Sequence, residues 1–440
     1  MSLSERVQRA AGGTVRQTRP DDKLLQSLRE GVQELLSVDE LALLTASNPR
    51  QARNELRSAC RRVFDGSMWA SIDEETRSNL VSQLVDAVFG FGAIEDLIAD
   101  EGITEIIVNG PSKIFVEREG KLLPTDRSFA SVSDLHVLID RILGPLGRRV
   151  DEASPMVNAR LPQGHRVNVV VAPIALEGPY ITIRKFSRHV ITLDEMVASG
   201  SVEQQVKTFL VWAIGARKSI AVVGGTGSGK TTLLNALSCE IPHDERIITI
   251  EDSAELRFLE HPHVVRMEAR PVNAEGVGEV TIRDLVINAL RMRPDRIIVG
   301  ECRGAEALDM LQAMNTGHDG SLTTLHANSP SESISRLTTM VRYEADLPVD
   351  VIEANIATAI SIVVQMRRNA DGSRCVSDIV ELSFDEEKRR CVVQPVYERA
   401  PGELAGSWRS MPLWLENAQV RSLVEKEEVE SWRQACSWEA

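Results

Sequence analysis

The chain has 440 residues, of which 43% are hydrophobic and 26% charged, a composition that excludes a fibrous or a wholly disordered protein. Its formal net charge of −14 at pH 7 argues against a protein whose main task is to wrap nucleic acid, so nucleic acid is not an expected partner. A chain of this length predicts about three domains.

Neither the cysteines nor the apolar residues point to a secreted or membrane-spanning chain. The six cysteines include no C-x-x-C pair, which indicates neither a disulfide framework nor a zinc site. No window approaches about 18 uninterrupted apolar residues, and the N-terminus lacks the apolar core of a signal peptide. We therefore expect a soluble cytoplasmic chain with no direct membrane span, which reaches membranes only through partners.

The N-terminal part of the chain reads as helical. Residues 1–20 are polar and predicted to be disordered, and Leu24, Leu28 and Val32 then follow the i, i+4 spacing of a helix. Similar spacing recurs further on, so residues 21–90 are predicted to form a helical N-terminal extension. A small helical bundle is the favoured interpretation, and a regulatory or docking role is the alternative.

Two domains and a tail are predicted to follow the extension. Residues 91–186 hold short β-rich runs, ITEIIVN, KIFVERE, RVNVVVAP and YITIRKF, with one helix among them, which indicates a smaller α/β domain. Residues 187–200 read as a linker. Over residues 201–399 apolar strands alternate with helices and end in a small β appendage, which predicts an α/β sheet domain. Residues 400–440 read as a polar, tryptophan-rich C-terminal tail.

The stretch AVVGGTGSGKTTL, which starts at Ala221, contains a complete G-x-x-x-x-G-K-T phosphate loop. The glycines allow a tight turn whose backbone N–H groups face phosphate oxygens, and the helix that begins at Lys230 adds its positive dipole end. We expect Lys230 to reach the β and γ phosphates of ATP, and Thr231 to supply a hydroxyl to the bridging Mg²⁺. The predicted nucleotide-binding residues are Gly225, Thr226, Gly227, Ser228, Gly229, Lys230, Thr231 and Thr232.

Acidic residues and a histidine follow three apolar strand-like runs. Glu251 and Asp252 follow IITI, and Glu301 follows IIVG, where Gly300 is expected to leave room beside the phosphate. The run SLTTL delivers His326. Because the carboxyl ends of parallel strands meet at one edge of a sheet, we expect these groups to lie beside the phosphate loop.

These side chains suit ATP hydrolysis, which needs a metal clamp, a positioned water and cationic support. Glu301 is the first choice for orienting and polarising the water, and Glu251 is a competitor for that role. Asp252 or Glu251 is an alternative holder of Mg²⁺ through its hydration shell. His326 is expected to sense the γ-phosphate, since no second histidine has the spacing of a metal site.

Four segments, GGTGSGKTT, TIEDSAEL, LRMRPDRIIVGECRG and TGHDGSLTTLHANSP, resemble the signature boxes of the secretion ATPases that drive type II and type IV systems. They correspond to Walker A, an Asp box, an atypical Walker B and a His box. Upstream, ITEIIVNGPSKIFVEREGKL and RLPQGHRVNVVVAP look most like the CpaF-type ATPase of tight-adherence (Flp) pilus assembly. The resemblance covers roughly Phe91–Leu382.

The resemblance implies an α/β fold in which a RecA-like P-loop ATPase domain follows a smaller N-terminal domain. It also implies a homo-oligomer, a hexameric ring that is peripheral at the inner face of the cytoplasmic membrane, with inner-membrane platform proteins of a pilus or secretion system as partners. In such rings arginines of the N-terminal domain reach the phosphates. By motif matching these are Arg166 and Arg184, with Arg160 behind them.

Three functions remain open at this stage. The leading hypothesis is a motor that couples ATP hydrolysis to pilin assembly or protein export, because a pure nucleotide switch has no need of Glu251, Glu301 and His326 together. The alternatives are a nucleotide-gated assembly scaffold with slow hydrolysis and a conjugative type IV secretion ATPase. The extension-type pilus branch is disfavoured, because the four-cysteine zinc module is missing. The tryptophans of the tail are expected to fold back on their own domain, and the alternative is that they form an anchor for a platform protein.

Overall fold

The structure is a computed structural model, and it describes residues 20–37, 41, 44, 49–118, 120–161, 163–186, 190–258, 261–272, 277–415 and 423–438. The predicted disordered segment therefore lies outside the described residues, apart from its last one. The chain divides into two compact units, Met1–Phe186 and Ser187–Ala440, and each is described by itself. No helix in the described part of the chain is long and apolar enough to cross a membrane.

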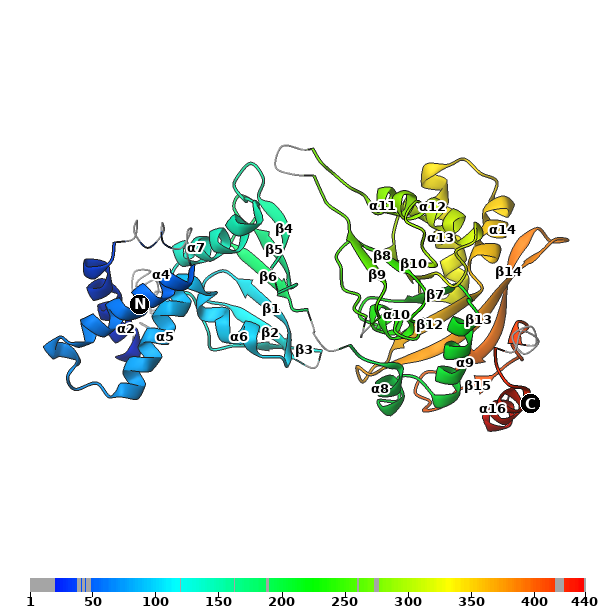
Figure 1. Cartoon of the computed structure of the whole chain (residues 1–440), viewed down its shortest axis with the longest axis horizontal. Coiled ribbons are helices and arrows are strands. Elements are labelled where there is room, and N and C mark those ends of the chain that lie inside the picture. The colour runs from blue at the N-terminus through cyan, green and yellow to red at the C-terminus, as the bar shows by residue number, and fades with distance from the viewer. Residues whose placement is uncertain are drawn as a thin grey trace, which may run out of the picture. The chain divides into compact units, whose positions relative to one another are not determined.

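The first unit begins with three mutually packed helices, α2 (Pro20–Leu35), α4 (Pro49–Phe64) and α5 (Glu74–Phe89). Their apolar residues recur at helical spacing, so each helix presents one stripe to the others. Leu28, Leu56 and Leu80 are at most 1% exposed where the stripes meet. The 3-10 turn η1 (Ser67–Trp69) adds the Trp69 ring, which packs edge-on against Phe64. These helices form a small core of their own (Figure 1).

The first unit continues as a six-stranded antiparallel sheet in the order β3-β2-β1-β6-β5-β4. Buried and exposed residues alternate along its inner strands, so one face is covered, chiefly by α7 (Val132–Leu143). The Ser131 side chain caps α7 by accepting from the Asp134 N–H. The strands are β1 (Ile103–Asn109), β2 (Ile114–Arg118), β3 (Lys121–Pro124), β4 (Met156–Arg160), β5 (Arg166–Val170) and β6 (Tyr180–Arg184), and the short helical segments are η2 (Gly92–Ile94), α6 (Glu95–Ala99) and η3 (Gly144–Leu146).

The second unit is built on a nine-stranded sheet in the order β15-β14-β13-β12-β7-β11-β10-β8-β9. The six strands from β12 to β9 run parallel, so their carboxyl ends share one edge, and β13 to β15 extend the sheet antiparallel. The strands are β7 (Ile220–Gly224), β8 (Ile247–Glu251), β9 (Val264–Glu268), β10 (Arg296–Cys302), β11 (Leu322–His326), β12 (Ile362–Arg368), β13 (Arg374–Asp385), β14 (Arg390–Glu398) and β15 (Ser407–Trp408).

Helices cover both faces of this sheet (Figure 1). Ile220 and Val222 of β7 join one core and Ala221 and Val223 join the other, which explains why the run is apolar without alternation. The helices of the first face are α8 (Leu193–Ala198), α9 (Gln204–Gly215), α10 (Lys230–Ser238) and α16 (Lys426–Ala435). Those of the second face are α11 (Ile282–Ala289), α12 (Glu306–Asn315), α13 (Pro330–Glu344) and α14 (Val349–Ala359).

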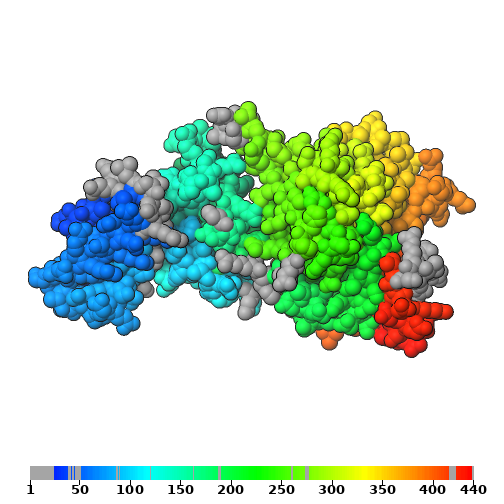
Figure 2. All heavy atoms as spheres, in the orientation of Figure 1, coloured from blue at the N-terminus to red at the C-terminus, as the bar shows by residue number. Residues whose placement is uncertain are grey.

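Two segments outside the predicted domain of residues 201–399 contribute to the core of the second unit. Part of the predicted linker forms α8, which begins with a capping box and buries Leu193 and Met196 completely or nearly so. The described part of the tail folds back, and Trp408 and Trp432 are buried. The Trp432 Nε1–H donates to the Gln205 carbonyl of α9 at 2.9 Å, and Figure 2 shows this red segment against the green one.

Candidate nucleotide site

The predicted phosphate loop joins β7 to α10, and three of its glycines adopt conformations that a side chain would strain. Gly227 and Gly229 are left-handed, with φ of 69° and 95°. At Gly224, with φ of 154°, an added Cβ would lie 2.4 Å from the carbonyl oxygen of Met366 on the neighbouring strand. The N–H groups in the first turn of α10 have no partner within the helix, so the loop and the helix start form an anion site.

Lys230 supplies a buried positive charge inside the loop. Lys230 is only 7% exposed, and its Nζ group donates to the Gly225 carbonyl at 2.8 Å. Burial lowers the pKa of Lys230, the charge of Glu301 acts to raise it, and the charge of Arg303 lowers it. The charge of Lys230 is thus coupled to that of Glu301, which lies on β10.

The hydroxyl groups of the loop differ in their surroundings. Ser228 is 2% exposed, and its Oγ has no hydrogen-bond partner among the described residues. Thr231 and Thr232 are half-buried in the first turn of α10, whereas Thr226 is exposed at the tip of the loop. A buried hydroxyl without a partner is costly, so Ser228 Oγ is an atom that a polar ligand would satisfy.

Strand pairing brings His326 and Glu301 to the side of the loop. His326 is the register partner of Gly224, at the point where β11 and β7 end. Its Nε2 atom lies 2.9 Å from Glu301 Oε1. The pair lacks the alignment of a hydrogen bond, so Oε1 is buried without a hydrogen-bond partner among the described residues. The two side chains thus lie together at the sheet edge where the sequence predicts them.

Arg303 completes this group, and the sequence interpretation missed it. Its Nη2 donates to Glu301 Oε2 at 2.5 Å, and its Nη1 lies 3.8 Å from Asp252 Oδ2. Burial raises the pKa of Glu301, but the Arg303 hydrogen bond and the charges of Arg303, His326 and Lys230 outweigh it, so the pKa lies below its ordinary value. The signal was available, since Arg303 stands two residues after Glu301 at a strand end, where alternate residues share a side.

His326 is held in its neutral form. Burial lowers the pKa of His326, and the charge of Lys230 lowers it further, although the Glu301 carboxylate acts in the opposite direction. Because an unperturbed histidine already titrates near pH 6.5, a lowered pKa leaves the imidazole neutral at pH 7. A neutral ring can donate one hydrogen bond and accept another.

Glu251 lies at the end of β8 and is 3% exposed, but it is engaged in local structure. Its Oε2 accepts from the backbone N–H groups of Glu255 and Leu256 at 2.6 and 2.8 Å. Burial raises the pKa of Glu251 although these two hydrogen bonds lower it. A Cβ at Gly300 would lie 2.9 Å from Glu251 Cγ. Gly300 therefore leaves room for Glu251, and the expected room beside a phosphate stays a prediction.

The three predicted arginines gather within the first unit. Register pairs join Arg160 to Arg166 and Arg166 to Arg184, so all three lie at one edge of the sheet, on β4, β5 and β6. Arg160 Nε donates to the Gly164 carbonyl at 3.3 Å, and its guanidinium lies 5.8 Å from the centre of the Phe186 ring. Three neighbouring guanidinium groups form a basic edge suited to phosphate groups.

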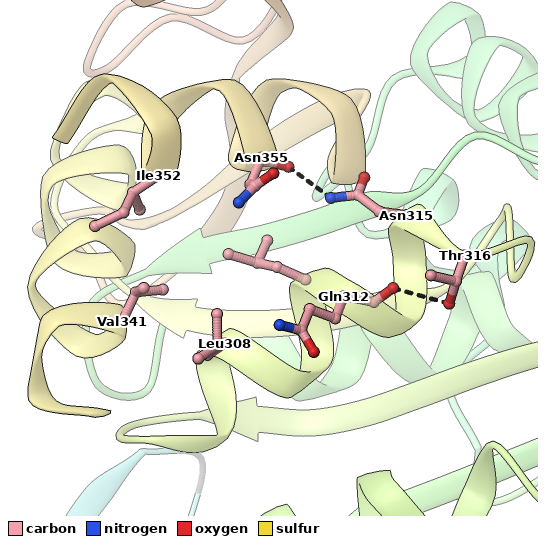
Figure 3. A pocket seen from close by; sticks show the side chains of 8 residues that line it. Leu308, Gln312, Asn315, Thr316, Val341, Ile352 and Asn355 are labelled. Carbon is pink, nitrogen blue, oxygen red and sulfur yellow. Dashed lines mark hydrogen bonds between the residues drawn. The ribbon is translucent and has the colours of Figure 1, made fainter. Parts of the chain in front are cut away.

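A separate pocket of about 230 Å³ lies between α12, α13 and α14 (Figure 3). Its lining includes Leu308, Val341 and Ile352 together with uncharged polar side chains, and Asn315 Nδ2 donates to the Asn355 carbonyl at 3.2 Å. A pocket without charged lining is a poor phosphate site. The sheet edge beside the phosphate loop therefore remains the candidate nucleotide site.

Comparison with known proteins gives this site a context. The family model described as "Type II/IV secretion system protein" matches residues 88–432, which is most of the chain. The chain belongs to the type II/IV secretion system protein family. This confirms the family that the four sequence boxes predict, while the tight-adherence subtype stays a prediction.

Relatives in this family come from several bacteria. The Mycobacterium tuberculosis protein Rv3659c is 36% identical over 326 residues, covering 73% of this chain and 92% of the relative. The type IV secretion system protein PtlH of Bordetella pertussis is 34% identical over 309 residues, covering 64% and 90%. The conjugal transfer protein TrbB of Rhizobium radiobacter is 32% identical over 287 residues, covering 64% and 84%.

Solved structures of this kind share the fold. The pilus retraction motor PilT, solved with bound ADP, matches with a TM-score of 0.50 and 19% identity over 78% of this chain and 89% of that one. The Yersinia pseudotuberculosis ATPase DotB matches with a TM-score of 0.50 and 18% identity over 67% and 79%. The likeness is one of fold, and it agrees with the expected RecA-like α/β architecture.

Proposed function

We propose that the chain is an ATP-hydrolysing motor of a secretion or pilus assembly machine. The observation that supports this best is the cluster of Glu301, His326 and Arg303 beside the phosphate loop. A protein that only binds nucleotide needs the loop, whereas hydrolysis also needs a group that orients water and cations that stabilise the developing charge. The cluster supplies both kinds of group.

Each side chain has a role in the proposed reaction. The loop N–H groups and Lys230 bind the β and γ phosphates of ATP. Glu301, kept ionised by Arg303, orients and polarises the attacking water. His326, neutral and close to Glu301, donates a hydrogen bond to the γ-phosphate or accepts one from the water. Glu251 anchors the loop that follows β8, and we assign it this positioning role ahead of the competing one as water activator.

The oxygen atoms of the site fit a hard divalent cation. Mg²⁺ prefers oxygen ligands and keeps several of its waters, and no group of three or more His, Cys, Asp or Glu residues in the described part of the chain could hold a metal by itself. Thr231 would hold Mg²⁺ together with the phosphates, with Asp252 acting through its hydration shell. The Glu301 Oε1 atom without a hydrogen-bond partner is a further acceptor for such a water. The ion would neutralise charge on the β and γ phosphates.

The proposed machine is a homo-oligomeric ring, with six subunits by analogy with the family. In this ring, Arg160, Arg166 and Arg184 are proposed to contact the phosphates of ATP, in addition to the phosphate loop. The ring would act at the inner face of the cytoplasmic membrane on platform proteins of a pilus or secretion system. The conjugal transfer relative TrbB keeps a type IV secretion ATPase as the second candidate.

The first experiment measures ATP binding and steady-state ATP turnover with Mg²⁺. Wild-type protein should bind and hydrolyse ATP, and Lys230→Ala should lose both, with an unchanged circular dichroism spectrum. Glu387→Gln, at an exposed turn after β13, is the control and should match wild type. Turnover in Lys230→Ala equal to that of wild type would rule out the site. If the wild-type protein binds ATP tightly but platform proteins fail to stimulate its slow turnover, the result would favour a nucleotide-gated scaffold.

A further inference from the structure

The hairpin formed by β12 and β13 stands beside the phosphate loop. β12 runs parallel to β7 with Met366 paired to Gly224, so its last residues extend past the end of β7. The chain turns over residues 369–373 and returns at Arg374, the first residue of β13. Two arginines, Arg368 and Arg374, thereby flank the loop.

Arg374 holds the tip of the loop directly. Its Nε group donates to the Gly227 carbonyl at 2.9 Å, although 147 residues separate the two. A Cβ at Gly229 would lie 3.4 Å from Arg374 Cδ, so the side chain also lies beside Gly229. Arg368 lies nearby, 3.7 Å from where a Gly227 Cβ would be, but its side chain makes no hydrogen bond or ion pair with any described residue.

This hydrogen bond fixes the direction of a peptide group. In a planar trans peptide the C=O and the following N–H point to opposite sides, so holding the Gly227 oxygen toward Arg374 directs the Ser228 N–H to the other side. The Ser228 N–H donates to the Gly225 carbonyl at 3.4 Å, and the same oxygen accepts from Lys230 Nζ at 2.8 Å. The peptide group that Arg374 holds is therefore the one whose N–H closes the loop beside the Lys230 ammonium.

The loop needs such an external constraint because its own residues give little. Glycine has free access to many backbone conformations, and the loop carries Gly225, Gly227 and Gly229 in alternation. The hairpin, by contrast, is internally tied. Asp371 Oδ1 accepts from the Ser373 N–H and hydroxyl, and the Asn369 side-chain amide donates to Ser373 Oγ. Arg374 thus transfers the rigidity of the hairpin to the loop.

We propose that Arg374 is a positioning residue that presets the phosphate loop for nucleotide binding. The inference rests on the proposed ATP-binding function. Arg374 binds a carbonyl of the loop, so we expect its effect to reach the nucleotide only through the loop and to fall equally on the ground state and the transition state. Such an effect raises KM and leaves kcat nearly unchanged.

The test compares Arg374→Gln, Arg374→Lys and Arg368→Gln with wild type. KM and kcat come from ATP turnover, the Kd from titration with a fluorescent ATP analogue, and the Tm is measured without nucleotide. Arg374→Gln should raise KM and Kd about fivefold to tenfold, the size of one typical hydrogen bond, with kcat within about twofold. Arg374→Lys should recover part of the loss, and Arg368→Gln should behave as wild type. The Tm of Arg374→Gln should fall by no more than about 4 °C, the effect of losing one hydrogen bond, and the Tm of Arg368→Gln should equal that of wild type.

Three results would overturn the proposal. If Arg374→Gln binds ATP as tightly as wild type and Lys230→Ala does not bind it, this inference alone is overturned and the proposed function stands. Equal losses in Arg374→Gln and Arg368→Gln would indicate a general charge effect in place of the hydrogen bond. A wild-type chain that binds no ATP would overturn both the inference and the proposed function.

Discussion

Replacing Gly300 by alanine brings a methyl group against the side chain of Glu251. The new Cβ would lie 2.9 Å from Glu251 Cγ and 3.5 Å from its Cβ. Glu251 has little freedom to move away, because its Oε2 accepts two backbone N–H groups of the next loop. Overpacking of a buried site costs roughly 1–3 kcal/mol, so we expect Gly300→Ala to lower the free energy of unfolding by about 2 kcal/mol.

A double-mutant cycle isolates this contact. Glu251→Ala removes Cγ, so adding Gly300→Ala to that variant should cost less than about 0.5 kcal/mol, and the difference is the coupling energy. Five of the six tryptophans lie in the second unit, so urea unfolding followed by tryptophan fluorescence reports mainly on it. Gly215→Ala, at the end of α9 with nothing within 4 Å of the added Cβ, is the control. Equal costs of Gly300→Ala in both backgrounds would refute the assignment of Gly300 to Glu251.

Two further predictions concern Arg303 and Trp432. Arg303→Gln removes the hydrogen bond and charge that hold the Glu301 pKa below its ordinary value, so that pKa should rise and the acid limb of the kcat–pH profile should move to higher pH. An acid limb in the same place would show that Glu301 does not govern it. Trp432→Ala should lower the free energy of unfolding by about 3–5 kcal/mol, because this ring packs against Trp212 and Trp408. A fully stable variant that fails only in binding a platform protein would instead favour the anchor hypothesis.

The phosphate loop and the strand-end residues were predictable because their chemistry is local. A glycine-rich run between a strand and a helix marks the phosphate loop in the sequence, and parallel strands deliver Glu301 and His326 to the same edge of the sheet. In the structure this places His326 opposite Gly224, the first glycine of the loop.

Other features depended on contacts between distant parts of the chain. The pairing of Arg374 with Gly227 joins positions 147 residues apart, and no motif marks it. The tryptophans of the C-terminal segment fold back on their own domain, as the favoured interpretation predicts, but no sequence pattern identifies α9 as the partner, to whose Gln205 carbonyl the Trp432 indole donates. The sequence pattern of an amphipathic helix shows which of its faces is exposed, but not which other element its buried face packs against.

Glu251 shows why residue type alone did not decide between roles. A carboxylate at the end of a parallel strand suits metal binding, water activation or loop anchoring equally well. Only the two backbone donors on its Oε2 and its contact with Gly300 favour anchoring. These contacts come from residues whose own sequence signals are weak.

The central claim is that Glu301 activates water at an ATP site, and the most direct test is the turnover of Glu301→Gln measured beside its ATP affinity. This variant keeps the size of the side chain and removes its charge. We predict that Glu301→Gln binds ATP with a Kd close to that of wild type and loses roughly 10²–10⁴-fold in kcat, the contribution of a positioned general base. Turnover within about twofold of wild type, at an unchanged Kd, would contradict the claim.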